Sequence, residues 1–103
     1  MDSDGYPLPE TLARLADWQI NSYEDCEDLL AWLQTIWKWN DYIKPAKRRQ
    51  RSSKGGRLYR TWYVSTGGWS GHEEIIGILQ ENYVFWGFAW YSSRRGGHYE
   101  FRV

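Results

Sequence analysis

The chain has 103 residues, a formal net charge of zero and an aromatic content of 18% that includes eight tryptophans. This length leaves room for one domain with a modest core, so no second domain is expected. The charges are segregated, because residues 1–43 hold nine acidic residues against two basic ones, and residues 44–103 hold eleven basic residues against four acidic ones. This polarity favours an anionic partner for the basic half, unless the two halves neutralise each other in the fold.

Cysteine usage and the N-terminal sequence indicate where the protein works. Cys26 is the only cysteine, so no internal disulfide can form, and no metal-ligand spacing surrounds it. Residues 1–10 lack the pattern of a signal peptide, and no apolar run approaches the length of a membrane span. We therefore expect a cytoplasmic protein without membrane contact, metal or cofactor.

Two helices are expected in the acidic half. Pro9 suits the first position of a short amphipathic helix over residues 9–19. Ser22 is expected to cap a second, longer helix, in which apolar residues recur at helical spacing. Pro45 lies beyond its end, so helical structure is predicted within residues 9–43.

Residues 44–57 contain seven basic residues, no acidic residue and a glycine pair, without hydrophobic periodicity. This composition predicts a flexible basic loop. Clustered cations beside aromatic strands can bind single-stranded nucleic acid through charge and stacking, although a solvated loop is favoured in a chain without net charge. The candidate nucleic-acid-binding residues in this loop are Lys47, Arg48, Arg49, Arg51 and Lys54.

The basic half then predicts three strands and one helix. The helix spans residues 72–82, and the Ser70-x-x-Glu73 pattern before it is that of a capping box. The strands are rich in aromatic and β-branched residues and are expected at Leu58–Ser65, Tyr83–Ser92 and His98–Val103. The predicted fold class is α+β in a single domain over residues 1–103, with two N-terminal helices followed by a β-α-β-β unit and a three-stranded mixed sheet.

A ligand site is predicted at one edge of this sheet. A helix that connects the first two strands would make them parallel, with a right-handed crossover, so their C-terminal ends would share an edge, and the last strand would lie between them or at an edge of the sheet. The glycine loop after the first strand and the arginine turn after the second would meet there, and their free N–H groups and guanidinium groups suit phosphate or carboxylate. The alternative, that these segments only make tight turns, carries equal weight. The candidate ligand-binding residues are Thr66, Gly67, Gly68, Trp69, Ser70, Gly71, Arg94, Arg95, Gly96, Gly97, His98 and Tyr99.

Catalytic motifs are not matched. Residues 68–71 differ from a nucleophile elbow because the second glycine comes one position early, and the loop lacks the lysine and the spacing of a P-loop. His72, Glu73 and His98 would permit an acid–base site, but a capping glutamate and packed or surface histidines are favoured. An enzyme is therefore the least favoured hypothesis.

The strings TGGWSGHEE at residues 66–74 and SRRGGHY at residues 93–99 resemble a family of small proteins encoded by bacteriophages and prophages. The resemblance covers about the last half of the chain, from Leu58 onward. It implies an accessory protein of the host cytoplasm that sequesters a nucleotide signal or blocks a host defence protein.

Three functional hypotheses follow from these patterns. The leading one is a non-enzymatic protein that binds an anionic, nucleotide-like ligand at the edge formed by the glycine loop and the arginine turn. The second is a nucleic-acid-binding or protein-blocking module that uses the basic loop and exposed aromatic side chains. The third is a hydrolase or nuclease that uses the two histidines and Glu73.

Overall fold

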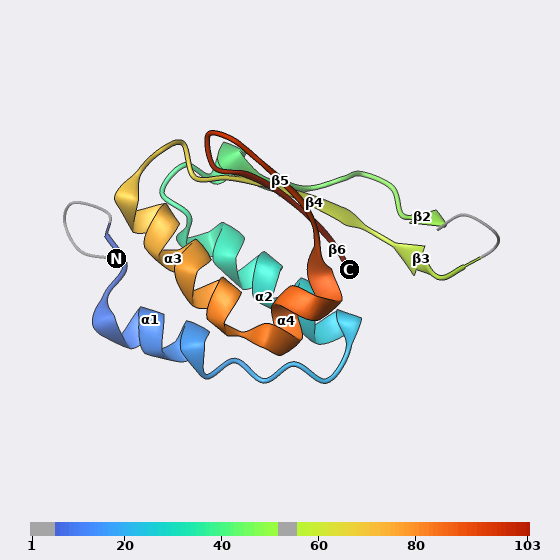
Figure 1. Ribbon diagram of the computed structural model, residues 1–103, viewed down its shortest axis with the longest axis horizontal. Coiled ribbons are helices and arrows are strands. Elements are labelled where there is room, and N and C mark those ends of the chain that lie inside the picture. Colours follow the sequence, from blue (N-terminus) through green and yellow to red (C-terminus); the bar gives the residue numbers. More distant parts are fainter. Residues whose placement is uncertain (1–5, 52–55) are drawn as a thin grey trace.

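The computed structural model describes residues 6–51 and 56–103 and has an α+β fold (Figure 1). In chain order the elements are α1 (Pro9–Ala16), α2 (Tyr23–Ile36), the 3-10 helix η1 (Asn40–Tyr42), β1 (Ile43–Pro45), β2 (Gln50–Arg51), β3 (Leu58–Tyr59), β4 (Thr61–Ser65), α3 (Ser70–Glu81), α4 (Tyr83–Ala89), β5 (Trp90–Arg94) and β6 (His98–Arg102). None of the helices in the described part of the chain has the length and hydrophobicity needed to cross a lipid bilayer.

The helices lie on one side of an antiparallel sheet (Figure 1). Within the described residues, this sheet has the strand order β1-β4-β6-β5. Trp62 of β4 pairs with Phe101 of β6, and both are buried against the helices. Tyr63, the next residue of β4, pairs with Glu100 and therefore points to the opposite face. The sheet thus has an inner face that belongs to the core and an outer face that carries polar and aromatic side chains.

The mixed three-stranded sheet predicted from the sequence is wrong. Segment 43–45, assigned to the end of a helix and the start of a loop, forms the additional strand β1, and every pairing is antiparallel. Strands β4 and β5 are not neighbours, because β6 lies between them and is antiparallel to both. They consequently run in the same direction, and their C-terminal ends still lie at the same edge of the sheet.

The second helix is shorter than predicted. Ser22 caps α2 as expected, since its Oγ accepts a hydrogen bond from the backbone N–H of Asp25. The helix ends at Ile36 because Trp37 turns away, and its indole N–H donates to the Ser65 carbonyl at 3.0 Å. Ile43, predicted on the same helix, pairs with Val64 in the sheet instead. The first helix is also shorter than residues 9–19, and it ends at residue 16.

Residues 83–89 form helix α4, although a strand was predicted there. Asn82 caps this helix, because its Oδ1 accepts a hydrogen bond from the Phe85 backbone N–H at 3.1 Å. Phe85 and Ala89 lie one turn apart and are buried, whereas Tyr83 is 83% exposed. Almost every side chain of this segment is apolar, so its hydrophobic pattern could not separate a helix from a buried strand.

The predicted basic loop over residues 44–57 includes the end of β1 and all of β2, so its described part forms one side of a β-ribbon that extends away from the sheet (Figure 1). Its base is the β1–β4 pair, and further out β2 pairs with β3 through Gln50 opposite Tyr59 and Arg51 opposite Leu58. Lys47 and Arg48 are exposed at the bend between β1 and β2. Lys54 lies outside the described residues.

Candidate functional site

The two glycine segments meet at the edge of the sheet, as the sequence predicted. The Thr66 backbone N–H donates to the Gly97 carbonyl at 3.0 Å. Gly97 has a φ of 79°, and a Cβ at this position would overlap the Thr66 hydroxyl oxygen. This contact requires glycine on grounds of both backbone conformation and space.

The loop uses the amide groups that were expected to hold a phosphate. The Gly67 N–H donates to Ser65 Oγ at 3.3 Å, and the Gly68 N–H donates to Thr66 Oγ1 at 3.2 Å. The predicted capping box is also wrong, because α3 begins at Ser70 and its N-terminus has no side-chain cap. The Ser70 hydroxyl lies 3.1 Å from the Tyr6 hydroxyl instead. The amides of Gly67 and Gly68 therefore hold the turn together and do not form a phosphate cradle.

His72 is fully buried and has a structural role. Its Nδ1 lies 3.0 Å from the Thr66 carbonyl, and its Nε2 accepts a hydrogen bond from the Lys38 backbone N–H at 2.9 Å. Because a backbone N–H can only donate, the proton of the neutral ring resides on Nδ1. Burial lowers the pKa of His72. Both ring nitrogens are thus occupied, and His72 is unsuited to the acid–base site hypothesised with Glu73 and His98.

Trp69 belongs to the same aromatic cluster. Its ring stands perpendicular to that of His72 at 4.5 Å and packs against Tyr6 at 4.7 Å. It also covers Gly71, where a Cβ would lie 2.5 Å from the indole ring. The His72 ring stacks on Trp37 with a centroid distance of 4.1 Å. Residues 69–71 therefore anchor the start of α3, and Trp69, Ser70 and Gly71 do not line the groove on the outer face of the sheet.

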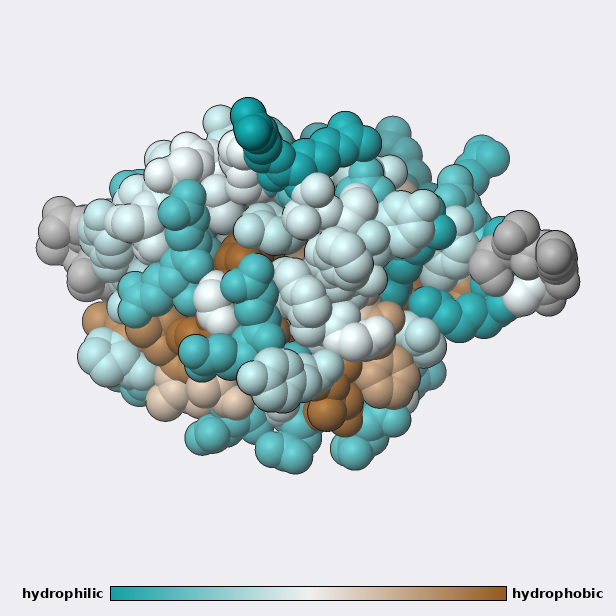
Figure 2. Space-filling model, viewed as in Figure 1, coloured by the Kyte–Doolittle hydropathy of each residue, from teal (hydrophilic) through white to brown (hydrophobic). Residues whose placement is uncertain are grey.

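That groove has a volume of about 590 Å³. A row of paired residues crosses the four strands and lines it, namely Lys44 of β1, Tyr63 of β4, Glu100 of β6 and Ser92 of β5. In the view of Figure 2, hydrophilic side chains gather along the sheet at the top, and hydrophobic patches appear among the helices below. The volume is in the range typical of small-molecule sites.

Five of the predicted site residues line this groove: Gly67, Arg94, Gly96, His98 and Tyr99. Thr66 and Gly97 join the two turns through their backbone hydrogen bond, and Gly68 donates to Thr66, but these residues do not line the groove. Arg95 is an exposed turn residue that does not line it either. The structure therefore divides the predicted site into a lining part and a supporting part.

The groove combines rings with charges of both signs. Tyr42 and Tyr63 both line it and are 45% and 46% exposed. Lys44 and Arg94 supply cations, and Arg94 lies 4.0 Å from the Glu100 carboxylate. Gly67 lies close beneath the aromatic side chains, since a Cβ there would lie 2.8 Å from the Tyr42 ring. This set of groups can stack a planar ring, accept N–H groups and pair with an anion.

Sequence reasoning missed several lining residues, chiefly Tyr42, Lys44 and Tyr63. Tyr42 was hidden by the prediction of a helix up to residue 43, and Lys44 by its assignment to a basic loop. Tyr63 could have been found, because it alternates with Trp62 and Val64, which were assigned to one face of the strand. An aromatic residue between two residues assigned to the core-facing side of a strand must point to the opposite face, so the sequence marks it as a candidate exposed ring.

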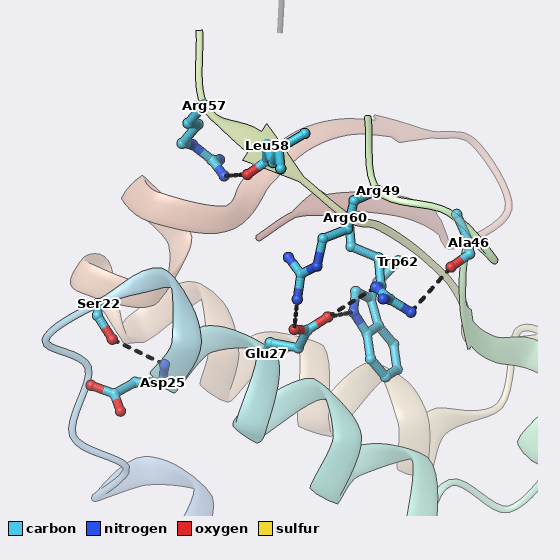
Figure 3. Close-up of polar contacts among 9 residues, drawn as sticks. All are labelled: Ser22, Asp25, Glu27, Ala46, Arg49, Arg57, Leu58, Arg60 and Trp62. Atoms are coloured by element: carbon cyan, nitrogen blue, oxygen red, sulfur yellow. Dashed lines mark hydrogen bonds and ion pairs between the residues drawn. The ribbon is translucent and has the colours of Figure 1, made fainter. Parts of the chain in front are cut away.

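The residues of the ribbon that were predicted to bind nucleic acid fall into three groups. Arg49 pairs with Glu27 of α2 at 2.8 Å, and Arg60, which lies between β3 and β4, approaches the same carboxylate at 3.4 Å (Figure 3). Arg51 donates to the Gly56 carbonyl. Lys47 and Arg48 make no such contact with the described residues, and Lys54 lies outside them.

Within the described residues, no three His, Cys, Asp or Glu side chains gather as a metal site. The resemblance to phage-encoded proteins stays a prediction, since no family model, no curated protein and no solved structure matches this chain.

Proposed function

We propose that this protein binds an anionic, nucleotide-like ligand in the groove on the outer face of the sheet, without catalysing a reaction. The observation that carries the proposal is the placement of two half-exposed rings, Tyr42 and Tyr63, beside the cations Lys44 and Arg94 in one groove. A base stacks on a tyrosine ring, and its phosphate pairs with the cations.

The carboxylates of the groove fit the same ligand. Asp41 and Glu100 line the groove together with the two cations, so the site is not uniformly positive. Carboxylates accept hydrogen bonds from the N–H groups of a base, which a simple anion lacks. A ligand with both a phosphate and a base therefore satisfies more of the lining than inorganic phosphate does.

A binding role is favoured over catalysis because of the histidines. Of the three residues hypothesised for acid–base chemistry, His98 lines the groove, whereas His72 is buried with both ring nitrogens occupied. In a phage-infected cell, such a groove would sequester a nucleotide signal of the host, which is one of the roles that the sequence resemblance implies.

Calorimetric titration with mono-, di- and cyclic nucleotides, and with the matching nucleosides, tests the proposal. We expect phosphorylated compounds to bind more tightly than nucleosides. Arg94→Ala and Lys44→Ala should each weaken binding roughly ten-fold, because each removes a charge-assisted contact. Arg95→Ala is the matched control, since it removes the neighbouring charge outside the groove and should leave binding unchanged. No heat from any phosphorylated compound, or equal loss in Arg94→Ala and Arg95→Ala, would contradict the proposal.

A further inference from the structure

The binding surface continues beyond the groove along the outer face of the sheet. Arg102 pairs with Thr61, two residues before Tyr63 on the same strand and therefore on the same face. The Arg102 guanidinium lies 3.4 Å from the Tyr91 ring centroid and 4.6 Å from that of Tyr59. Tyr91 is 49% exposed. A second aromatic surface, supported by a cation, thus follows the groove two residues further along β4 and β6.

The base of the ribbon leads from the groove to further cations. Lys44 lines the groove and lies opposite Tyr63 in the β1–β4 pair. The pairing continues one residue further, because the Ala46 N–H donates to the Thr61 carbonyl at 2.7 Å. Lys47 and Arg48 follow directly and are exposed. Cations therefore continue along the chain from the groove onto the ribbon.

The other arginines of the ribbon are engaged within the protein. Arg49 and Arg60 converge on Glu27, as Figure 3 shows, and the Arg57 guanidinium lies 3.5 Å from the centroid of the Tyr23 ring. A guanidinium held by an internal carboxylate contributes little to an external phosphate without losing that partner. Among the described cations of the ribbon, Lys47 and Arg48 are exposed without such a contact, and they lie on the part of the ribbon that adjoins the groove.

We infer that the ligand of this surface is a single-stranded polynucleotide, one of whose nucleotides occupies the groove while its backbone continues past Tyr91 and Arg102 onto Lys47 and Arg48. This inference rests on the proposed function, since it places one nucleotide in the same groove. Stacking platforms beside a line of cations bind single strands with little dependence on sequence, because every base has a π-face. An open sheet face accepts a polymer that enters at one end and leaves at the other.

The test compares polymer with monomer on the full chain. Fluorescence anisotropy of labelled (dT)12 and (U)12 gives the polymer affinity, and displacement by dTMP and UMP gives the monomer affinity. We expect at least one 12-mer to bind ten-fold or more tightly than its mononucleotide. Tyr63→Ala should weaken the binding of both, because the groove is shared.

The double variant Lys47→Ala/Arg48→Ala separates the inference from the proposed function. It should weaken 12-mer binding and leave mononucleotide binding unchanged. The negative slope of log K against log salt should become shallower by about 1.4, because two phosphate contacts are lost. Arg14→Ala, which removes a cation from α1 on the far side of the helices, should leave both unchanged. The two ribbon side chains are exposed, so circular dichroism of the double variant should match that of the wild type.

Two results would overturn the inference and leave the proposed function intact. In the first, mononucleotides bind but the 12-mers bind no more tightly than they do. In the second, the double variant binds the 12-mer as tightly as the wild type. Tighter binding of duplex than of single strands would also overturn it. Failure of both the mononucleotides and the 12-mers to bind would overturn the proposed function and, with it, the inference.

Discussion

At the scale of single residues, His72 joins the start of α3 to two other segments through its hydrogen bonds with Thr66 and Lys38. Burial lowers its pKa in the folded protein, whereas the unfolded chain has the ordinary value of about 6.5. The unfolded state therefore takes up a proton first as the pH falls. The stability that comes from neutral His72 is complete above about pH 6.5 and is lost as the pH falls through the lower, folded pKa.

We therefore predict that the free energy of unfolding, measured with urea, is constant between about pH 7 and 8 and declines as the pH falls below about 6.5. His72→Gln should be less stable by about 1 to 3 kcal/mol at pH 7, because it breaks a buried hydrogen-bonded contact. In this variant the free energy of unfolding should also fall much less with decreasing pH than in the wild type. His98→Gln is the control, since His98 is exposed, and it should retain the decline. A decline of equal size in the His72 variant would refute the assignment.

A pair of glycines gives a second prediction at this scale. Gly97 has a φ of 79° and lies against Thr66, so Gly97→Ala is strained and sterically blocked. We expect a loss of stability of about 2 kcal/mol or more in urea denaturation. Gly77 lies within α3, and apart from its chain neighbours and the nearby backbone of its own helix nothing lies within 4 Å of the position that a Cβ would take. Gly77→Ala should therefore stabilise the protein by about 0.5 to 1 kcal/mol. Similar effects of the two substitutions would show that the edge of the sheet is looser than the contact between Gly97 and Thr66 indicates.

At the scale of elements, Glu27 fixes the ribbon to α2. Its carboxylate contacts Arg49 and Arg60 and accepts a hydrogen bond from the Trp62 indole N–H at 3.2 Å (Figure 3). All three partners belong to the two sides of the ribbon and to β4. One side chain of the acidic half therefore contacts both sides of the basic ribbon where it leaves the sheet.

Glu27→Gln should loosen the base of the ribbon. We expect a loss of about 1 kcal/mol of stability, because the ion pairs are partly exposed and therefore weak individually. Amide hydrogen exchange at Ala46, whose N–H donates to Thr61, should accelerate. Asp28→Asn is the matched control, because it removes the same charge from the next, exposed position of the helix. Equal acceleration in both variants would mean that net charge, and not the Glu27 contacts, holds the ribbon.

The sequence predicted those elements whose pattern is decided locally. Helix α3 and strands β4 and β6 show clear periodicity, and Ser22 signals the start of α2. Strand β1 depends on pairing with β4, and its basic sequence carries no local sign of that partner. Helix α4 is apolar on all sides, so only its packing decides between helix and strand.

The candidate site was predictable to a similar degree. Glycine-rich segments at two strand ends led to the expectation that they meet, and the contact between Thr66 and Gly97 bears this out. The sequence could not show whether the loop amides are free, because the hydroxyl groups of Ser65 and Thr66 compete for them. The groove itself depends on β1 and η1, which were not predicted.

At the scale of the whole molecule, the segregation of charge along the sequence has two consequences. Part of it is neutralised internally, where Glu27 of the acidic half meets Arg49 and Arg60 of the basic half. Two other cations of the basic half, Lys44 and Arg94, line the groove on the outer face of the sheet. A chain with zero net charge can therefore still present a surface that attracts an anion.

Cys26 allows the coupling between the core and the binding surface to be measured. Its thiol is fully buried on α2, and burial raises its pKa to about 12, so it should not react with thiol reagents in the folded state at neutral pH. Labelling then requires the core to open. A ligand that binds only the folded protein should slow labelling, because at a free concentration one hundred times its Kd it stabilises the fold by about 2.7 kcal/mol.

The measurement is the labelling rate with and without the 12-mer that binds most tightly, under conditions in which refolding is faster than the thiol reaction. We expect a slowing of roughly 100-fold at that concentration. The labelling rate in strong denaturant is the control and should not change with ligand, since no folded protein remains to bind it. A native-state rate that is insensitive to ligand, although binding is measured independently, would mean that α2 opens locally while the sheet stays folded. In that case the thiol and the binding surface would belong to separate cooperative units.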